Sequence, residues 1–189
     1  MKGRNHIVTG TAMAASAALA LERFPVPAAV GAVLPLERYG YGPAGWAACA
    51  GCAALYVFGL ALPDIDNRGL VSKWLHFSLP LRHRGWTHSL WAAALFLVPS
   101  LLVPACWPLR FVALGMLAHD LMDALSQAGW AMFYPLGKWR TYHDTVMVRG
   151  WTPGLYSSSS PGSEDAVAGA VTVINIAWWA FWAYLRFFV

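Results

Sequence analysis

Five long runs of hydrophobic residues divide the chain, and each is close to the 20 residues that a helix needs to cross a bilayer. These runs lie at about 7–21, 44–62, 89–107, 109–127 and 166–185. They predict an all-α, polytopic integral membrane bundle of five spans, forming a single domain over residues 1–189. Residues 24–36, interrupted by three prolines, either prolong the first span or lie in the membrane interface.

The composition agrees with a membrane protein. Hydrophobic residues make up 58% of the chain and charged residues only 12%, about half the share of a soluble domain. This excludes an ordinary soluble enzyme and a disordered chain. The net charge of +4 comes without a long basic tract, so we expect no nucleic-acid partner. Cys49 and Cys52 lie within an apolar run and lack a second ligand pair, so we interpret them as ordinary helix residues.

The basic residues predict an orientation. With the N-terminus in the cytoplasm, the inward segments hold nine Lys and Arg: Lys2, Arg4, Arg68, Lys73, Arg82, Arg84, Lys138, Arg140 and Arg149. The outward segments hold four: Arg23, Arg38, Arg110 and Arg186. Basic residues favour the cytoplasmic side, so we expect a multi-pass protein of the inner membrane. Nearly all Asp and His then lie at inward helix ends, which predicts one shared site at the cytoplasmic surface.

His119 and Asp123 lie four residues apart within a predicted span, so they share one helix face. They could bind one cation, or they could hydrogen-bond each other. Ionisable groups inside a span are costly and usually functional. Asp120 lies about 100° around the helix from His119 and need not join the pair.

Asp64 and Asp66, in L-P-D-I-D-N, end the second run. Pro63 disfavours helix at the residue before it, so the two carboxylates lie on a turn where they could converge on a cation. The alternative is an Asx turn that ends the helix, with one carboxylate capping and the other solvated.

Residues 82–89 read R-H-R-G-W-T-H-S. Gly85 predicts a bend that lets His83 and His88 face one centre, and Arg82 and Arg84 offer planar donors suited to phosphate. The alternative is a basic segment attracted to anionic lipid head groups.

His6 begins the first run, and its place beside the proposed site leads us to expect a retained span rather than a cleaved signal. Together, these His and Asp residues are hard and borderline ligands for divalent metals, and no Cys joins them. His76 and His143 lack partners at ligand spacing and are expected bystanders, although His143 and Asp144 could contribute from a cap. Residues 129–165, rich in Trp, Tyr and Pro, are expected to form that cap.

The motifs L-P-D-I-D-N, H-R-G-W-T-H-S, L-A-H-D-L-M-D and Gly129 to Tyr134-Pro135 resemble the YdjM family, membrane-bound proteins regarded as metal-dependent hydrolases. The resemblance implies the metal ligands His6, Asp64, Asp66, His83, His88, His119 and Asp123. It also implies that Glu164 is the acidic residue that follows the cap. This sequence departs from the family pattern at Asn67, Asp120 and Ser126. More distantly, the pattern resembles zinc-dependent phospholipase C enzymes, which use a His-x-x-x-Asp helix.

These observations predict a hydrolase that uses zinc, or else manganese or magnesium, to cleave a phosphoester of a membrane lipid or polyprenyl substrate. Arg84 and Arg82 would stabilise charge on the phosphate, and Glu164 would orient a ligand or transfer a proton. The alternative is a non-enzymatic ion-binding or transport protein. Proteolysis is disfavoured because no H-E-x-x-H helix occurs. The sequence leaves the oligomeric state open.

Overall fold

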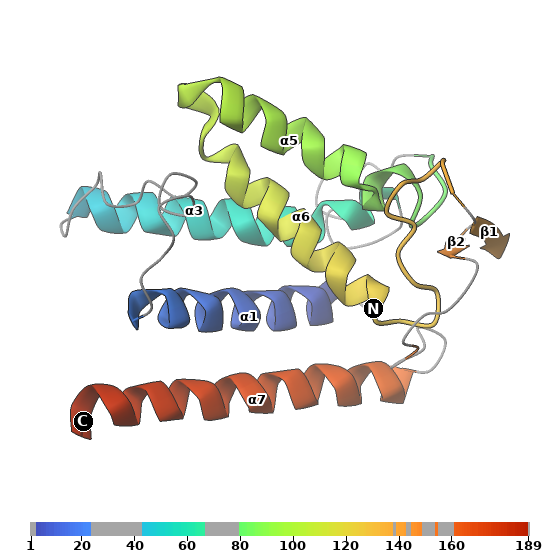
Figure 1. The fold of residues 1–189 in the computed structure, drawn as a ribbon. Coiled ribbons are helices and arrows are strands. Elements are labelled where there is room, and N and C mark those ends of the chain that lie inside the picture. Colours follow the sequence, from blue (N-terminus) through green and yellow to red (C-terminus); the bar gives the residue numbers. More distant parts are fainter. Residues whose placement is uncertain are drawn as a thin grey trace.

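The structure is a computed structural model, and it describes residues 3–23, 43–66, 80–137, 139–142, 145–148, 154 and 161–188. The described residues are mostly helical, as predicted (Figure 1). The segment 24–36, His76, His143 and Asp144 lie outside the described residues, so the expectations for them stay predictions.

Three long helices form one side of the molecule. α1 spans Gly3–Arg23, α3 spans Pro43–Ala61 and α7 spans Pro161–Phe188. At about 1.5 Å per residue, each is about as long as the hydrocarbon core is thick, or longer. α7 begins before the predicted start at residue 166, so Glu164 lies in the first turn of a helix rather than in the cap.

The other two helices are shorter than the predicted spans. α5 ends at Leu102 and α6 covers Leu109–Ala124, with the short 3₁₀ helix η4, Pro104–Cys106, between them. Proline disfavours helix at the residue before it, and Pro104 accordingly ends α5. Residues 103–107 and 125–127 belong to the predicted spans, but they are not α-helical. Hydropathy alone does not reveal where the helices end.

α3 and α6 cross at very short range because glycines face each other. A Cβ atom on Gly59 would lie 2.2 Å from the backbone oxygen of Val112, and one on Gly115 would lie 2.2 Å from that of Tyr56. Only a residue without a side chain permits this approach. Small residues at such contacts are typical of helix pairs in membranes.

α1 and α7 run in the same direction and are joined by polar side chains. Asn5 Nδ2 donates to Glu164 Oε1 at 3.0 Å, and eleven residues further along Ser16 Oγ donates to Asn175 Oδ1. Trp179 Nε1 donates back to Ser16 Oγ at 2.9 Å. The nearly constant sequence offset keeps the two helices in one register.

The region expected to cap the site contains a β-hairpin, which the all-α prediction omitted. β1, Trp139–Tyr142, pairs antiparallel with β2, Thr145–Val148. Val146 N–H donates to the His83 carbonyl at 2.8 Å, and Trp130 Nε1 donates to the His88 carbonyl at 2.6 Å. Described residues of this region therefore contact the segment that carries the two histidines.

One end of the bundle gathers the start of α1, α5 and α7 and the finish of α3 and α6 (Figure 1). This convergence is the one that the sequence predicted. Among the described residues, one helical stretch, Ala47–Asp66, is both long and apolar enough to cross a bilayer, and its mean hydropathy is 1.6. The five-span topology stays a prediction.

Candidate metal centre

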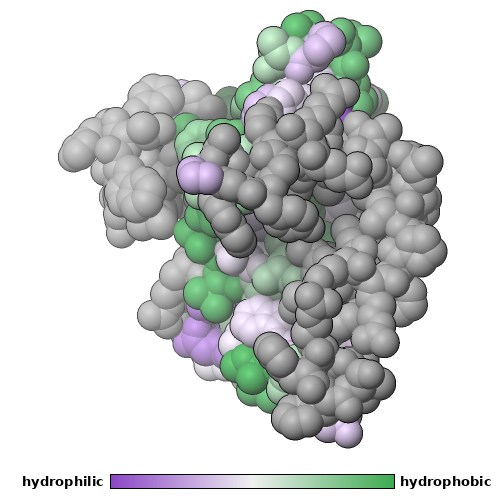
Figure 2. Space-filling view, turned by 90° about the vertical axis from the view of Figure 1, so that its left-hand side faces the viewer, coloured by the Kyte–Doolittle hydropathy of each residue, from purple (hydrophilic) through white to green (hydrophobic). Residues whose placement is uncertain are grey.

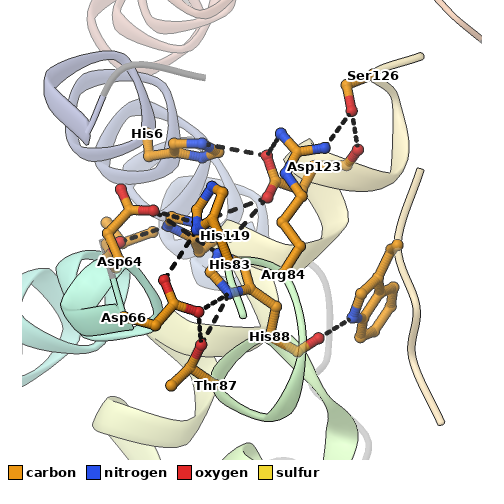
Figure 3. A network of polar contacts seen from close by, with 12 residues as sticks. His6, Asp64, Asp66, His83, Arg84, Thr87, His88, His119, Asp123 and Ser126 are labelled. Atoms are coloured by element: carbon orange, nitrogen blue, oxygen red, sulfur yellow. Dashed lines mark hydrogen bonds and ion pairs between the residues drawn. The ribbon is translucent and has the colours of Figure 1, made fainter. Parts of the chain in front are cut away.

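Polar side chains from five parts of the chain meet at this end (Figure 3). The first 3₁₀ helix η2, Pro63–Asp66, follows α3 and carries two carboxylates. The second, η3, Trp86–His88, precedes α5 and carries one imidazole. The remaining groups come from α1, from the turn before η3, and from α6 with the turn that follows it. The contributing residues are His6, Asp64, Asp66, His83, Arg84, Thr87, His88, His119, Asp123 and Ser126.

Four atoms form the middle of the cluster. His88 Nε2 lies 3.7 Å from Asp64 Oδ1 and 3.7 Å from Asp123 Oδ2. His119 Nε2 lies 3.9 Å and 3.8 Å from the same two oxygens. These separations are too long for hydrogen bonds. They are close to the roughly 3.3 Å that separates two ligands of one tetrahedral zinc ion.

The protonation of His119 is determined by its surroundings. Its Nδ1 lies 2.7 Å from the Leu60 carbonyl oxygen, which can only accept a hydrogen bond. Nδ1 therefore carries the proton, and the lone pair is on Nε2, which faces the two carboxylates. A carbonyl behind the ring is the usual partner of a metal-binding histidine.

His88 is oriented in a similar way. Thr87 Oγ1 donates to Asp66 Oδ2 and lies 3.1 Å from His88 Nδ1, so it can accept a hydrogen bond from that nitrogen. Nε2 of both His88 and His119 is buried and has no hydrogen-bond partner among the described residues. Two buried imidazole nitrogens without partners, facing two carboxylates, fit a divalent cation well, because an unpaired buried polar atom is otherwise costly.

Asp66 contacts the rings rather than the middle of the cluster. Its Oδ1 accepts a hydrogen bond from His83 Nδ1 at 2.8 Å, and its Oδ2 lies 3.5 Å from His88 Nδ1. We therefore interpret Asp66 as a residue that orients two histidines, the role that carboxylates often have behind metal ligands. Its predicted role as a direct ligand stays a prediction.

The two carboxylate oxygens of Asp123 face different partners. Its Oδ1 accepts a hydrogen bond from Arg84 at 2.8 Å and lies 3.3 Å from His6 Nε2. Its Oδ2 faces the imidazoles of His88 and His119, and these three residues and Asp64 form the central quartet. The Arg84 guanidinium also donates to Ser126 Oγ at 2.7 Å, so it holds the carboxylate from behind.

His6 extends the cluster from α1. Its ring stacks on that of His119, with centroids 3.8 Å apart. His6, His119 and Asp123 offer three ligand atoms within 4.8 Å of one another, and Asp64, His83 and His88 form a second such group. The distances from His88 to Asp123 and from His119 to Asp64 join these two groups, so the cluster has enough ligands for one cation or for two adjacent ones.

The turn before η3 adopts an unusual backbone. Arg84 has a positive φ of 59°, which is rare for a residue with a side chain. Gly85 follows, and a Cβ there would lie 2.9 Å from the Arg82 carbonyl. The bend predicted at Gly85 is confirmed. It turns Arg84 inward and brings His83 and His88 to the same carboxylates.

The environment of His88 is strongly negative. Burial lowers the pKa of this imidazole, but the carboxylates of Asp64 and Asp66 outweigh burial and raise the pKa to about 10. The same negative charge favours a divalent cation. A cation that binds at Nε2 at neutral pH would displace a proton.

Three further charged residues, Arg82, Glu164 and Asp120, lie near the cluster in different environments. Arg82 is exposed, and its guanidinium contacts Thr141 Oγ1 at 3.4 Å. Glu164 is buried and accepts a hydrogen bond from Asn5, the sequence neighbour of His6. Asp120 is fully buried, and neither of its oxygens has a hydrogen-bond partner among the described residues. The predicted phosphate-binding role of the arginines stays a prediction.

Sequence reasoning did not identify Asn5 or the Leu60 carbonyl, and it did not predict the contact between Thr87 and Asp66. Backbone carbonyls have no sequence signal. Asn5 precedes His6 in the chain, and that adjacency was the only available hint.

A family model described as YdjM inner membrane protein matches residues 1–188 of the chain. The chain belongs to the YdjM family. The proteins called inner membrane protein YdjM from Escherichia coli (strain K12) and Shigella flexneri are each 40% identical to it over 93 residues. Each alignment covers 42% of this chain and 46% of the relative, so the match spans about half the length of these relatives. No solved structure matches the chain. The family description supports a location in the inner membrane.

Proposed function

We propose that this YdjM family member is a metal-dependent membrane hydrolase that cleaves a phosphoester. The observation that carries the proposal is the quartet of Asp64, His88, His119 and Asp123. In it, two buried imidazole nitrogens that have no hydrogen-bond partner in the described part of the chain face two carboxylates. Neutral imidazole and carboxylate ligands without thiolate favour zinc, with manganese or magnesium as alternatives. When bound, such a cation supplies a Lewis acid that polarises a phosphoryl oxygen and makes a neighbouring water more acidic.

The chain's own residues would hold this centre in shape. The Leu60 carbonyl and the pair Thr87–Asp66 orient the two central imidazoles. Arg84 holds Asp123 so that one oxygen faces the histidines. His83 is the most exposed of the four histidines in the cluster, with 22% of its side chain accessible. It is therefore the group that a substrate would meet first.

The proposed substrate is a phosphoester of a membrane lipid or a polyprenyl chain. Support comes from the inner-membrane family and from the bulky apolar side chains around the cluster. Trp86 and Trp91 lie close in sequence to His88, and both are nearly half exposed. Exposed Trp is typical of the membrane–water interface, the depth at which lipid phosphates lie.

The Asp123→Asn variant tests the proposal. The change keeps the size of the side chain but removes the charge that balances a cation. We expect full-length protein purified in detergent to lose bound zinc. We also expect a loss of about 10³-fold or more in hydrolysis of bis(p-nitrophenyl) phosphate and of phosphatidylglycerol vesicles, because metal-assisted stabilisation contributes several kcal/mol.

The matched control is Asp165→Asn, which removes an exposed carboxylate near the start of α7 that accepts a hydrogen bond from Asn5 outside the quartet. It should keep both the metal and the activity of the wild type. Stoichiometric metal in the wild type without hydrolysis of either substrate would instead favour the non-enzymatic ion-binding function. Full metal occupancy in Asp123→Asn would overturn the proposed centre.

A further inference from the structure

The bend between α5 and α6 is apolar throughout. Residues 101–109 read L-L-V-P-A-C-W-P-L and include no charged side chain. Leu101, Leu102 and Val103 are 55%, 75% and 46% exposed. Bends in water are usually built from polar residues, and an exposed run of apolar residues signals contact with something apolar. Figure 2 looks onto the end opposite the cluster, and hydrophobic residues predominate at its top, where the hairpin lies.

The two helices of the hairpin are also short. α5 has 13 residues and α6 has 16, which correspond to about 20 Å and 24 Å of helix. The hydrocarbon core is about 30 Å thick. α6 also crosses α3 obliquely, and the bend stops short of the far ends of α3 and α7 (Figure 1). A hairpin that enters at the level of the cluster therefore ends before it reaches the opposite membrane surface.

Backbone N–H groups of the bend form hydrogen bonds within the protein, as an environment without water requires. Pro104 and Pro108 have no N–H. The Val103 N–H donates to the Pro99 carbonyl of α5 at 2.8 Å, and the N–H groups of Cys106 and Trp107 donate to carbonyls within the bend at 2.9 and 3.4 Å. Inside a bilayer, backbone groups must be satisfied internally because no water is available. The 3₁₀ turns of this bend meet that requirement at these positions.

Arg110, the charged residue nearest the bend, also forms hydrogen bonds within the protein. Arg110 donates to the Ser100 carbonyl from Nε at 3.3 Å and from Nη2 at 2.9 Å. Ser100 itself is fully buried. The guanidinium thus binds a carbonyl at the end of α5 and joins the two helices, a common solution for a cation within a membrane. The five-span topology had placed this arginine in an outward loop.

We propose that α5 and α6 form a re-entrant hairpin whose bend is inserted into the acyl-chain interior of the bilayer. Three long helices, α1, α3 and α7, then provide the crossings. The hairpin enters and leaves at the end that carries the cluster, so His88 lies at its entry and Asp123 at its exit. This inference does not depend on the proposed hydrolysis, because it rests on the lengths, side chains and hydrogen bonds of the bend.

Depth measurements with spin labels test the hairpin. Cys106 already lies in the bend, so a variant with Cys49→Ala and Cys52→Ala leaves one native cysteine for a nitroxide label. The full chain is reconstituted in phosphatidylethanolamine–phosphatidylglycerol vesicles. We expect collisions with oxygen and a loss of collisions with a water-soluble nickel chelate at position 106.

Two control variants, in a background without the native cysteines, carry Pro43→Cys at the start of α3 and Arg82→Cys beside the cluster. Both should collide freely with the nickel chelate. Ala105→Cys in the same background should behave like Cys106. Nickel accessibility at positions 105 and 106 as high as at position 43 would show that the bend reaches water, and it would overturn the re-entrant hairpin in favour of two full spans.

Discussion

Two helix pairs support the candidate centre, and their contacts differ in kind. α3 and α6 meet backbone to backbone at Gly59 and Gly115. α1 and α7 meet through hydrogen bonds, of which those of Asn5 and Ser16 are examples. Within lipid the hydrophobic effect does not drive helices together, so association relies on close packing or on polar contacts. This chain uses one solution for each pair.

The difference matters because the two pairs contribute unequally to the centre. The α3–α6 pair brings the Leu60 carbonyl to His119 and leads into the turn that carries Asp64. The α1–α7 pair contributes His6, which stacks on His119 from outside the quartet. Close backbone contact does not tolerate added atoms, whereas a hydrogen bond in a membrane contributes little on average. The central ligands therefore depend on the less tolerant pair.

The largest expected effect concerns the glycines. Gly115→Ala would place a Cβ 2.2 Å from the Tyr56 carbonyl, so the helices must separate. We expect the free energy of unfolding to fall by about 1–3 kcal/mol or more, measured by tryptophan fluorescence during denaturation in mixed micelles. Gly51→Ala is the control, because a Cβ there meets no atom within 4 Å. Equal stability of the two variants would contradict the close packing of α3 against α6.

The next effect distinguishes the histidines of the two pairs. His119→Ala removes a quartet ligand, and we expect it to abolish high-affinity zinc binding. His6→Ala removes a neighbour of the quartet, and we expect an affinity loss of about 10–100-fold, as for groups behind metal ligands. Zinc titration with a competing chelator measures both. His76→Ala, outside the predicted ligand set, should match the wild type. A greater loss for His6→Ala than for His119→Ala would reverse the comparison.

The smallest effect belongs to the polar contact in the middle of α1 and α7. Ser16→Ala removes the hydroxyl that contacts both Asn175 and Trp179. We expect the free energy of unfolding to fall by about 0.6 kcal/mol, the average for hydrogen bonds between membrane helices. Zinc affinity should be unchanged. Destabilisation as large as that of Gly115→Ala would show that the two pairs do not differ as described.

The convergence of the ligands could be predicted from the sequence because it follows from local patterns. Helix periodicity places His119 and Asp123 on one face, and Pro63 and Gly85 indicate the turns that bring in Asp64 and His88. The alternation of helix direction then places these ends together. Each of these inferences needs only neighbouring residues.

The pairings within the cluster could not be predicted in this way. Arg84 meets Asp123 across 39 positions and His83 meets Asp66 across 17, and no local pattern specifies such contacts. The β-hairpin was missed because residues 129–165 carry no clear period-2 alternation to mark it. The hydropathy of residues 89–127 suggested two full spans, although Pro104 and Pro108 shorten the helices.

X-ray absorption at the zinc edge tests the central claim most directly, namely that Asp64, His88, His119 and Asp123 hold a divalent cation. Full-length wild-type protein is purified in detergent without chelator, loaded with zinc and freed of excess metal. The account predicts at least one tightly bound zinc per chain, with imidazole scattering and only nitrogen and oxygen ligands at about 2.0–2.2 Å. Failure to retain stoichiometric zinc, or sulfur scattering at about 2.3 Å, would contradict it.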